Sequence, residues 1–314
     1  MPANLTPQYL EAEEAYRRAK TQQEKLAALE EMLRSIPKHK GTEKMQADIK
    51  RRIAKLRDEA ARAAKKGKAD PYRVEREGAG QVFVVGPPNS GKSSVVAALT
   101  SAKVVVADYP FATSAPVPGM MKHENVLIQL VDTPPITPDT FPPAMAAALR
   151  GGDGLLVTID ASSDDCLDML EECVGLLREG RATRDGQFLD VLATKVDLAG
   201  AAGNAELLAE VFPDLHIQPV SSQTMQGMDL LPRNVFLRLG VIRVYSKPPG
   251  RQPDLEAPFV LKEGSTVDDL ARAIHKDLHR NMKAARVWGS ARFDGQPVPR
   301  DYVLADGDIV EFRT

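Results

Sequence analysis

The chain has little of several features that mark other classes of protein. Its 314 residues include two cysteines and one tryptophan, and aromatic residues make up 5% of the total. No run approaches the roughly 20 consecutive apolar residues that a membrane span requires, and residues 1–30 are too charged for a secretory signal. Cys166 and Cys173, seven residues apart in a helical pattern, are predicted to be packing residues and not a metal or redox site. We therefore expect a cytoplasmic protein with no membrane partner.

The formal net charge is only −2, but the charge is unevenly distributed. Residues 34–68 contain thirteen Lys and Arg against four Asp and Glu, so the rest of the chain is acidic. A basic arm on an acidic body favours a polyanionic partner such as structured RNA, with no DNA expected. The alternative is a basic helix face that is simply solvated.

Residues 1–68 predict a helical hairpin whose second half is basic. Apolar residues recur at helical spacing over residues 7–35, as one arm, and again from Met45 to Leu56. The basic turn at residues 37–44 joins the two arms. We expect the apolar stripe to be buried inside the hairpin or on the next domain.

Residues 78–240 alternate apolar runs with helical patterns, which predicts a doubly wound, mostly parallel α/β sheet. The expected strands are residues 82–85, 126–131, 155–159, 188–193 and 217–220. In such sheets ligands bind at the carboxyl ends of the strands. The motifs that follow these runs are therefore candidate parts of one site.

The first run leads into a segment from Gly86 to Ser93 that fits G-x-x-x-x-G-K-[ST], the phosphate-binding loop. Its glycines let the backbone approach phosphate closely, and the N–H groups at the following helix start point at the anion. Lys92 reaches the β and γ phosphates, which makes it a candidate catalytic residue, and the Ser93 hydroxyl ligates Mg²⁺. The predicted phosphate-binding residues are Gly86, Pro87, Pro88, Asn89, Ser90, Gly91, Lys92, Ser93 and Ser94.

Two further segments are placed to respond to the γ-phosphate. Thr113, a second candidate catalytic residue, can put its hydroxyl on Mg²⁺ from the loop after the first helix. Asp132, at the end of the run 126–131, can accept hydrogen bonds from the water shell of the metal. The predicted metal site is thus Ser93, Thr113 and Asp132. Switch I is predicted as Phe111, Ala112, Thr113, Ser114 and Ala115, and switch II as Asp132, Thr133, Pro134 and Pro135.

The run 188–193 ends in Thr194-Lys195-Val196-Asp197, which favours guanine over adenine. An ionised carboxylate only accepts hydrogen bonds, so Asp197 can take both the ring N–H and the exocyclic amine of guanine. Adenine presents the wrong pattern and would leave the carboxylate unpaired. A backbone N–H near Ser222 would meet the guanine oxygen. The predicted guanine-binding residues are Thr194, Lys195, Asp197, Ser221 and Ser222, and the expected ligands are GTP and GDP.

Residues 241–314 read as strand, strand, helix and further strands, the order of a ubiquitin-like β-grasp. The helix is expected over Val267–Leu278, with Arg272, Lys276 and Arg280 in a row on its outer side. That row suits an RNA backbone or a solvated face equally well. His275 and His279 have zinc-helix spacing but no third ligand, which disfavours a metal site.

Together these motifs resemble a Ras-like GTPase. The patterns Gly-x-Pro-Asn-x-Gly-Lys-Ser and Asp-Tyr-Pro-Phe-x-Thr are similar to the Obg family. Residues 241–250, 274–278 and 286–289 resemble the TGS domain of the developmentally regulated GTP-binding proteins. The resemblance covers nearly the whole chain. It implies a Ras-like P-loop GTPase domain with an N-terminal helical hairpin and a C-terminal β-grasp (TGS) domain, and a K⁺ ion beside Asn89 in addition to Mg²⁺.

Two positions depart from the Ras-like pattern. Pro135 stands where the family has glycine, and proline has no N–H for the γ-phosphate and a fixed φ. Ile136 stands where Ras-like enzymes carry a glutamine that orients water. The resemblance to the Obg family implies that such a replacement is shared with its members, and hydrolysis should therefore be slow. We expect a GTPase that acts as a ribosome- or RNA-associated switch, with or without a regulatory protein. The alternatives are a nucleotide-stabilised scaffold with little turnover and a P-loop ATPase or kinase, which Asp197 disfavours.

Overall fold

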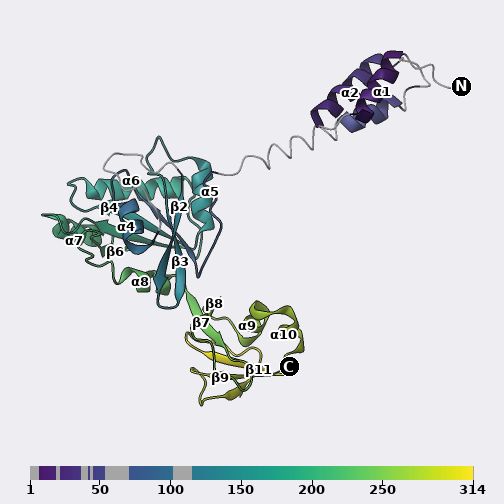
Figure 1. Ribbon diagram of the computed structural model, residues 1–314. Coiled ribbons are helices and arrows are strands. Elements are labelled where there is room, and N and C mark those ends of the chain that lie inside the picture. Colours follow the sequence, from purple (N-terminus) through teal and green to yellow (C-terminus); the bar gives the residue numbers. More distant parts are fainter. Residues whose placement is uncertain are drawn as a thin grey trace. The chain divides into compact units, whose positions relative to one another are not determined.

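The structure, a computed structural model, describes residues 7–18, 22–36, 42, 45–53, 71–101 and 115–313 (Figure 1). It divides into two compact units, residues 1–70 and residues 71–314, which are described here one at a time. None of the helices within the described ranges combines the length and the apolar character needed to cross a membrane.

The first unit is helical and has its own small core. Helices α1 (Pro7–Arg18) and α2 (Gln22–Ser35) pack on each other, and residues 45–53 are also helical. The prediction of one helical arm over residues 7–35 is therefore wrong, because these residues form two helices whose short apolar faces are buried against each other. The core residues are Tyr9, Ala12, Leu29, Met32, Ile36, Ile49 and Ile53.

The second unit begins with a six-stranded sheet that has the predicted doubly wound character. Its order is β2-β3-β1-β4-β5-β6, with every neighbouring pair parallel except β2 and β3. The strands are β1 (Gln81–Val85), β2 (Val117–His123), β3 (Val126–Asp132), β4 (Gly154–Asp160), β5 (Phe188–Thr194) and β6 (His216–Pro219). The edge strand β2 is an addition to the strands that the apolar runs predict.

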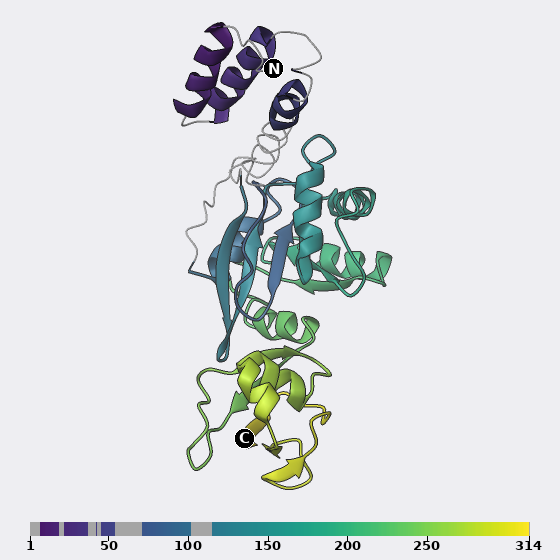
Figure 2. The ribbon, with the colours of Figure 1, turned by 90° about the vertical axis from the view of Figure 1, so that its right-hand side faces the viewer.

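Helices cover both faces of this sheet (Figures 1 and 2). One face packs against α5 (Pro143–Gly151), α6 (Cys166–Glu179) and α7 (Ala201–Val211), and the other against α4 (Lys92–Leu99) and α8 (Leu231–Arg238). Strand β1 is buried along its whole length, as expected for a central parallel strand. Cys166 and Cys173 are free thiols buried in the core on α6, which confirms their predicted packing role.

The C-terminal part of this unit is a five-stranded β-grasp sheet in the order β10-β9-β11-β7-β8. A hairpin is followed by two helices and three further strands, and the helices cover the apolar face of the sheet. On this domain the Lys247 ammonium lies 4.6 Å from the ring centroid of Trp288. The elements are β7 (Val241–Ser246), β8 (Phe259–Lys262), α9 (Val267–Ile274), α10 (Lys276–Asn281), β9 (Ala284–Trp288), β10 (Gln296–Val298) and β11 (Ile309–Arg313).

The single helix expected over Val267–Leu278 is wrong, because the chain is extended at His275 and divides it into α9 and α10. The His275 Nδ1 accepts the N–H of Asp277 at 3.1 Å and so caps the second helix. The expected basic row is interrupted at the same point. Arg272 pairs with Asp268, and His279 lies 2.9 Å from the same carboxylate, whereas the His275 ring is used for the cap.

The β-grasp domain is joined to the α/β domain by the turn between β2 and β3. Arg243 on β7 is bonded to Glu124 in this turn and to Asp306, with 2.7 Å between Arg243 Nη2 and Asp306 Oδ2. The Asn125 amide of the same turn donates to the Tyr245 hydroxyl at 2.7 Å. These bonds attach the tip of a hairpin in one sheet to the first strand of the other.

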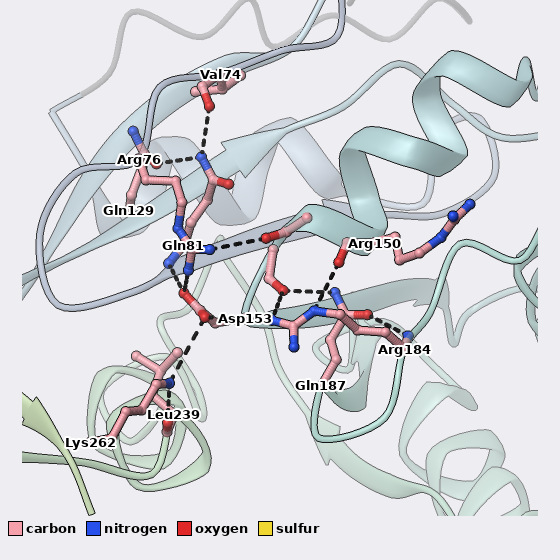
Figure 3. A network of polar contacts seen from close by, with 12 residues as sticks. Val74, Arg76, Gln81, Gln129, Arg150, Asp153, Arg184, Gln187, Leu239 and Lys262 are labelled. Atoms are coloured by element: carbon pink, nitrogen blue, oxygen red, sulfur yellow. Dashed lines mark hydrogen bonds and ion pairs between the residues drawn. The ribbon is translucent and has the colours of Figure 1, made fainter. Parts of the chain in front are cut away.

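A second connection surrounds Asp153, just before β4 (Figure 3). Its carboxylate accepts from Arg76 and, at 3.0 Å, from the N–H of Gln81 at the start of β1. Lys262 of β8 lies 3.9 Å away and also donates to the Leu239 carbonyl. The network thus ties the segment before β1, the sheet and the β-grasp domain together at the amino ends of the strands, away from the predicted site.

Candidate nucleotide-binding site

The loop between β1 and α4 has the backbone that close phosphate contact requires. Gly86 has a φ of 156°, and a Cβ there would lie 2.5 Å from the Thr158 carbonyl oxygen, so no larger residue fits. Gly91 caps α4 in the left-handed conformation, with a φ of 86°. The N–H groups at the start of α4 therefore lie at the end of the loop, where an anion is stabilised.

Lys92, the first residue of α4, turns its side chain back over the loop and is only 6% exposed. Its ammonium donates to the carbonyl oxygens of Gly86 at 3.1 Å and Pro87 at 2.7 Å. Burial lowers the pKa of this amine to about 8, although Asp132 opposes the shift. The loop thus holds one buried cation at its centre, as binding of a polyphosphate requires.

The Ser90 side chain is hydrogen-bonded within the protein and stabilises the loop. It is buried, and its hydroxyl lies 2.7 Å from the Thr158 hydroxyl on β4, which in turn donates to the Val85 carbonyl at 3.2 Å. Of the predicted phosphate-binding set, Ser90 can therefore offer its backbone N–H and not its hydroxyl. Asn89 is exposed and has a φ of 58°, and Pro87, Pro88 and Ser94 are half-buried.

Ser93 and Asp132 meet at the end of β3. The Ser93 hydroxyl donates to Asp132 Oδ2 at 2.7 Å, and Asp132 is fully buried. A hydroxyl backed by a carboxylate supplies the hard oxygen donors that Mg²⁺ prefers, so these two residues fit the predicted metal. Among the described residues no group of three or more His, Cys, Asp or Glu side chains forms a metal-binding cluster, so phosphate oxygens and water would have to complete the shell.

The segment after Asp132 is held against β1. The Thr133 hydroxyl donates to the Val84 carbonyl at 2.9 Å, and the Ile136 N–H donates to the Gly86 carbonyl at 3.1 Å. Pro135 is buried, and Ile136 is 2% exposed and packs into the core with helix α5. The side chain at position 136 therefore points away from the phosphate loop and into the protein interior.

The base-recognition segment follows β5 at the same edge of the sheet. Thr194 is buried and donates to the carbonyl oxygens of Ser90 at 2.9 Å and Ile159 at 3.0 Å, which links this segment to the phosphate loop. Lys195 has a φ of 59° and pairs with Asp160 at 2.5 Å. Asp197 is exposed, so its carboxylate is available to a ligand.

The loop after β6 organises itself around Ser221. This residue is fully buried, and its hydroxyl accepts the N–H groups of Gln223 at 3.2 Å and Thr224 at 3.1 Å. The loop is tied to the base-recognition segment by a bond from the Val196 N–H to the Val220 carbonyl at 3.4 Å. Ser221 thus shapes the loop, whereas Ser222 is half-buried at its surface.

Most of the predicted switch I lies outside the described residues. Phe111, Ala112, Thr113 and Ser114 fall in this segment, and the third predicted metal ligand, Thr113, falls with them. Ala115, the last residue of the predicted switch, is exposed just before β2. The structure therefore brings together the phosphate loop, switch II and the base-recognition residues.

Three residues at this site were not identified from the sequence. Thr158 and Asp160 lie at the end of β4 and contact the phosphate loop and Lys195, while the Asn204 amide donates to the Ala161 carbonyl at 2.8 Å. None of them belongs to a motif. Only their position in the sequence could have indicated two of them. Thr158 and Asp160 lie at the end of an apolar run, and that run lies between the two strands that carry the motifs.

Comparison with known proteins gives matches over both domains of the second unit. Residues 81–194 match the family described as 50S ribosome-binding GTPase, and residues 242–314 match the TGS domain. An uncharacterized GTP-binding protein of Methanocaldococcus jannaschii is 29% identical, and the alignment covers 92% of each chain. Developmentally-regulated G-protein 1 of Arabidopsis thaliana is 26% identical over 92% of this chain and 90% of its own. Among solved structures, a GTP-binding protein of Sulfolobus solfataricus in complex with GDP has a TM-score of 0.41 and 21% identity over 69% of this chain and 65% of that chain.

Proposed function

Because this chain belongs to the family of the developmentally regulated GTP-binding proteins, with a GTPase domain followed by a TGS domain, we propose that it binds GTP and GDP and hydrolyses GTP slowly. The observation that carries this proposal is the convergence at one sheet edge of a buried cation and an exposed carboxylate. Lys92 is held over the loop carbonyls, and Asp197 follows β5, whose last residue Thr194 bonds to the same loop.

Each residue has a separate task in nucleotide binding. The N–H groups of the loop and Lys92 hold the phosphates, and Lys92 neutralises the charge that builds up on the leaving group during hydrolysis. Asp197 accepts the two donors of guanine, while the loop that Ser221 shapes closes over the base. Ser93 would hold Mg²⁺ directly and Asp132 through water, and the ion would neutralise phosphate oxygens. Thr113 would complete that site, and a K⁺ ion beside Asn89 would add a further positive charge.

Calorimetry with GDP and ADP in the presence of Mg²⁺ tests the nucleotide assignment. We expect GDP to bind at least about a hundredfold more tightly than ADP, because adenine leaves the Asp197 carboxylate unpaired. Equal affinities would overturn the assignment. Single-turnover hydrolysis of GTP in K⁺ and in Na⁺ then separates a slow enzyme from a protein without turnover.

A scaffold with little or no turnover is the second candidate, and the structure has one observation that favours it. The segment 132–136 is held to β1 and to the phosphate loop by the protein's own hydrogen bonds, and Pro135 has no N–H to give to a γ-phosphate. A hydrolysis rate equal to that of buffer in both salts would select the scaffold.

We propose a ribosomal or RNA partner, whether the protein is a slow GTPase or a scaffold. The family description of residues 81–194 supports it, together with the basic charge of residues 34–68. Lys50 and Arg51 are exposed on the helical segment 45–53, whereas Lys55 lies outside the described residues. Charge reversal at Lys50 and Arg51 should weaken co-sedimentation with ribosomes and reduce its salt dependence. An unchanged salt dependence would assign them to a solvated face.

A further inference from the structure

The end of β4 carries two polar side chains that face the proposed nucleotide site. Thr158 and Asp160 are two residues apart, so they lie on the same face of the strand. Thr158 bonds to Ser90 in the phosphate loop, and Asp160 pairs with Lys195 in the base-recognition segment. In register, Asp160 lies opposite Thr194 on β5, immediately before that lysine. One strand end therefore contacts both halves of the site.

Both oxygens of the Asp160 carboxylate accept hydrogen bonds from neighbouring residues. Its Oδ2 lies 2.5 Å from Lys195 Nζ, and its Oδ1 accepts the Ser162 N–H at 3.0 Å and the Ser162 hydroxyl at 2.6 Å. Burial would raise the pKa of this carboxyl, but the hydrogen bonds from Lys195 and Ser162 outweigh burial and keep the pKa below its usual value. The group is therefore an anion fixed in one orientation by donors on both oxygens.

Lys195 is held at both of its ends. Its backbone is in the left-handed region with a φ of 59°, and its carbonyl oxygen accepts the Leu198 N–H at 3.0 Å. Its ammonium is held by Asp160. A lysine side chain on a free surface samples many rotamers, and fixing it before a ligand arrives removes that entropy loss from the binding step.

From this geometry we propose that Asp160 is a positioning residue for nucleotide-base binding, acting through Lys195. The proposal rests on the proposed function, in which the base binds beside Lys195 and Asp197. Asp160 does not touch the nucleotide. It keeps the lysine stem in one place beside the base, so that the loop between β5 and α7 is already in its binding shape.

A double-mutant cycle distinguishes this role from a general stabilising role. Calorimetry with GDP and Mg²⁺ is carried out on the wild type, Asp160→Asn, Lys195→Gln and the double variant. Asn has the same shape, and its Oδ1 can still accept both Ser162 bonds, but its NH2 group replaces the oxygen that accepts from Lys195, so the ion pair and its hydrogen bond are lost together. Asp160→Asn should weaken GDP binding by about tenfold in the wild-type background and have no effect in the Lys195→Gln background. Asp164→Asn, an exposed carboxylate of the same loop, is the matched control and should change nothing.

The following outcomes would overturn either the positioning role of Asp160 or the proposed function. An equal loss in both backgrounds means that Asp160 stabilises the loop independently of Lys195, and the positioning role is overturned. If the wild type binds no GDP, the proposed function fails instead, so the two failures are distinguishable. Should Asp160→Asn melt below the assay temperature, choline chloride provides the test: salt should weaken GDP binding more in the wild type than in Lys195→Gln, and equal slopes overturn the role.

Discussion

The backbone N–H of Ile136 donates to the carbonyl oxygen of Gly86 at 3.1 Å, and so joins the end of switch II to the phosphate loop. The same oxygen accepts the Lys92 ammonium, also at 3.1 Å. One carbonyl therefore links the segment after Asp132, the phosphate loop and the proposed catalytic lysine. Because Ile136 is also buried in the core, this end of switch II is held in place on two sides.

Replacing Pro135 should release this segment. Pro135→Gly supplies an N–H and a free φ, so the loop can offer a donor to the γ-phosphate. We expect the single-turnover rate of GTP hydrolysis to rise by about tenfold, because one added donor stabilises charge in the transition state. Pro134→Gly, at the half-buried neighbour, is the control. An unchanged rate in Pro135→Gly would mean that the missing N–H does not limit turnover.

Restoring the glutamine of Ras-like enzymes at position 136 should fail. The Ile136 side chain is 2% exposed in the core beside Val131 and Met145. Ile136→Gln would bury an amide there, and we expect a loss of about 2–4 kcal/mol in the free energy of unfolding with no gain in hydrolysis. Ile136→Val should cost about 1 kcal/mol. Urea unfolding and a GTPase assay on both variants check this, and faster hydrolysis in Ile136→Gln would contradict the buried position.

The base preference should follow the hydrogen-bonding groups at Asp197. Asp197→Asn exchanges one acceptor for a donor, which matches the second carbonyl of xanthine and not the amine of guanine. We expect GDP affinity to fall by about a hundredfold or more and xanthosine diphosphate to become the better ligand. Asp214→Asn, an exposed carboxylate elsewhere on the domain, is the control. Retention of the GDP preference in Asp197→Asn would remove this residue from base recognition.

Nucleotide affinity should decrease at alkaline pH because of Lys92. Burial sets the pKa of its amine at about 8, and only the charged form attracts phosphate. The affinity for GDP should therefore be constant below about pH 8 and fall by up to about tenfold per pH unit above it. Lys92→Arg should bind more weakly but without this decrease, since a guanidinium stays charged. A flat wild-type profile between pH 7 and 10 would rule out the lowered pKa.

Arg243 should stabilise both the β-grasp domain and its contact with the α/β domain. It is bonded to Asp306 of its own domain and to Glu124 of the α/β domain, and it lies 5.1 Å from the ring centroid of Phe236 on α8. Arg243→Met should lower the free energy of unfolding by about 2 kcal/mol, because it leaves a partly buried carboxylate unpaired. Glu124→Gln should matter less than Asp306→Asn, since Glu124 is the more exposed carboxylate. Thermal melts of these variants, with the exposed Arg251→Met as control, check this order.

The sequence predicted the regular parts of the fold because their signals are local. The buried parallel strands are short apolar runs. The loop between β1 and α4 can bind phosphate only with glycine, lysine and serine at fixed spacing, so its sequence motif can be recognised without the rest of the fold. Strand β2 was missed because Pro118 and Gly119 read as a turn. A proline is tolerated there because β2 is an edge strand, where a missing N–H breaks no ladder.

The remaining differences come from tertiary contacts. Helix α9 buries apolar side chains in the β-grasp core, and the partly buried Leu278 of α10 packs against the same core, so the helical spacing continues across the break at His275. Asp160 and Lys195 are 35 residues apart, and no local pattern indicates that they will meet. Only the parallel pairing of β4 and β5 brings their strand ends together.

The contact of Lys247 with Trp288 has a practical consequence. Trp288 is the one tryptophan of the chain and lies in the β-grasp domain. Its fluorescence is thus a natural reporter of that domain alone, since the nucleotide-binding domain contributes no indole. A cation over the ring responds to displacement of either partner, so the emission of the unlabelled protein can follow events at the C-terminal domain while nucleotide is added at the other.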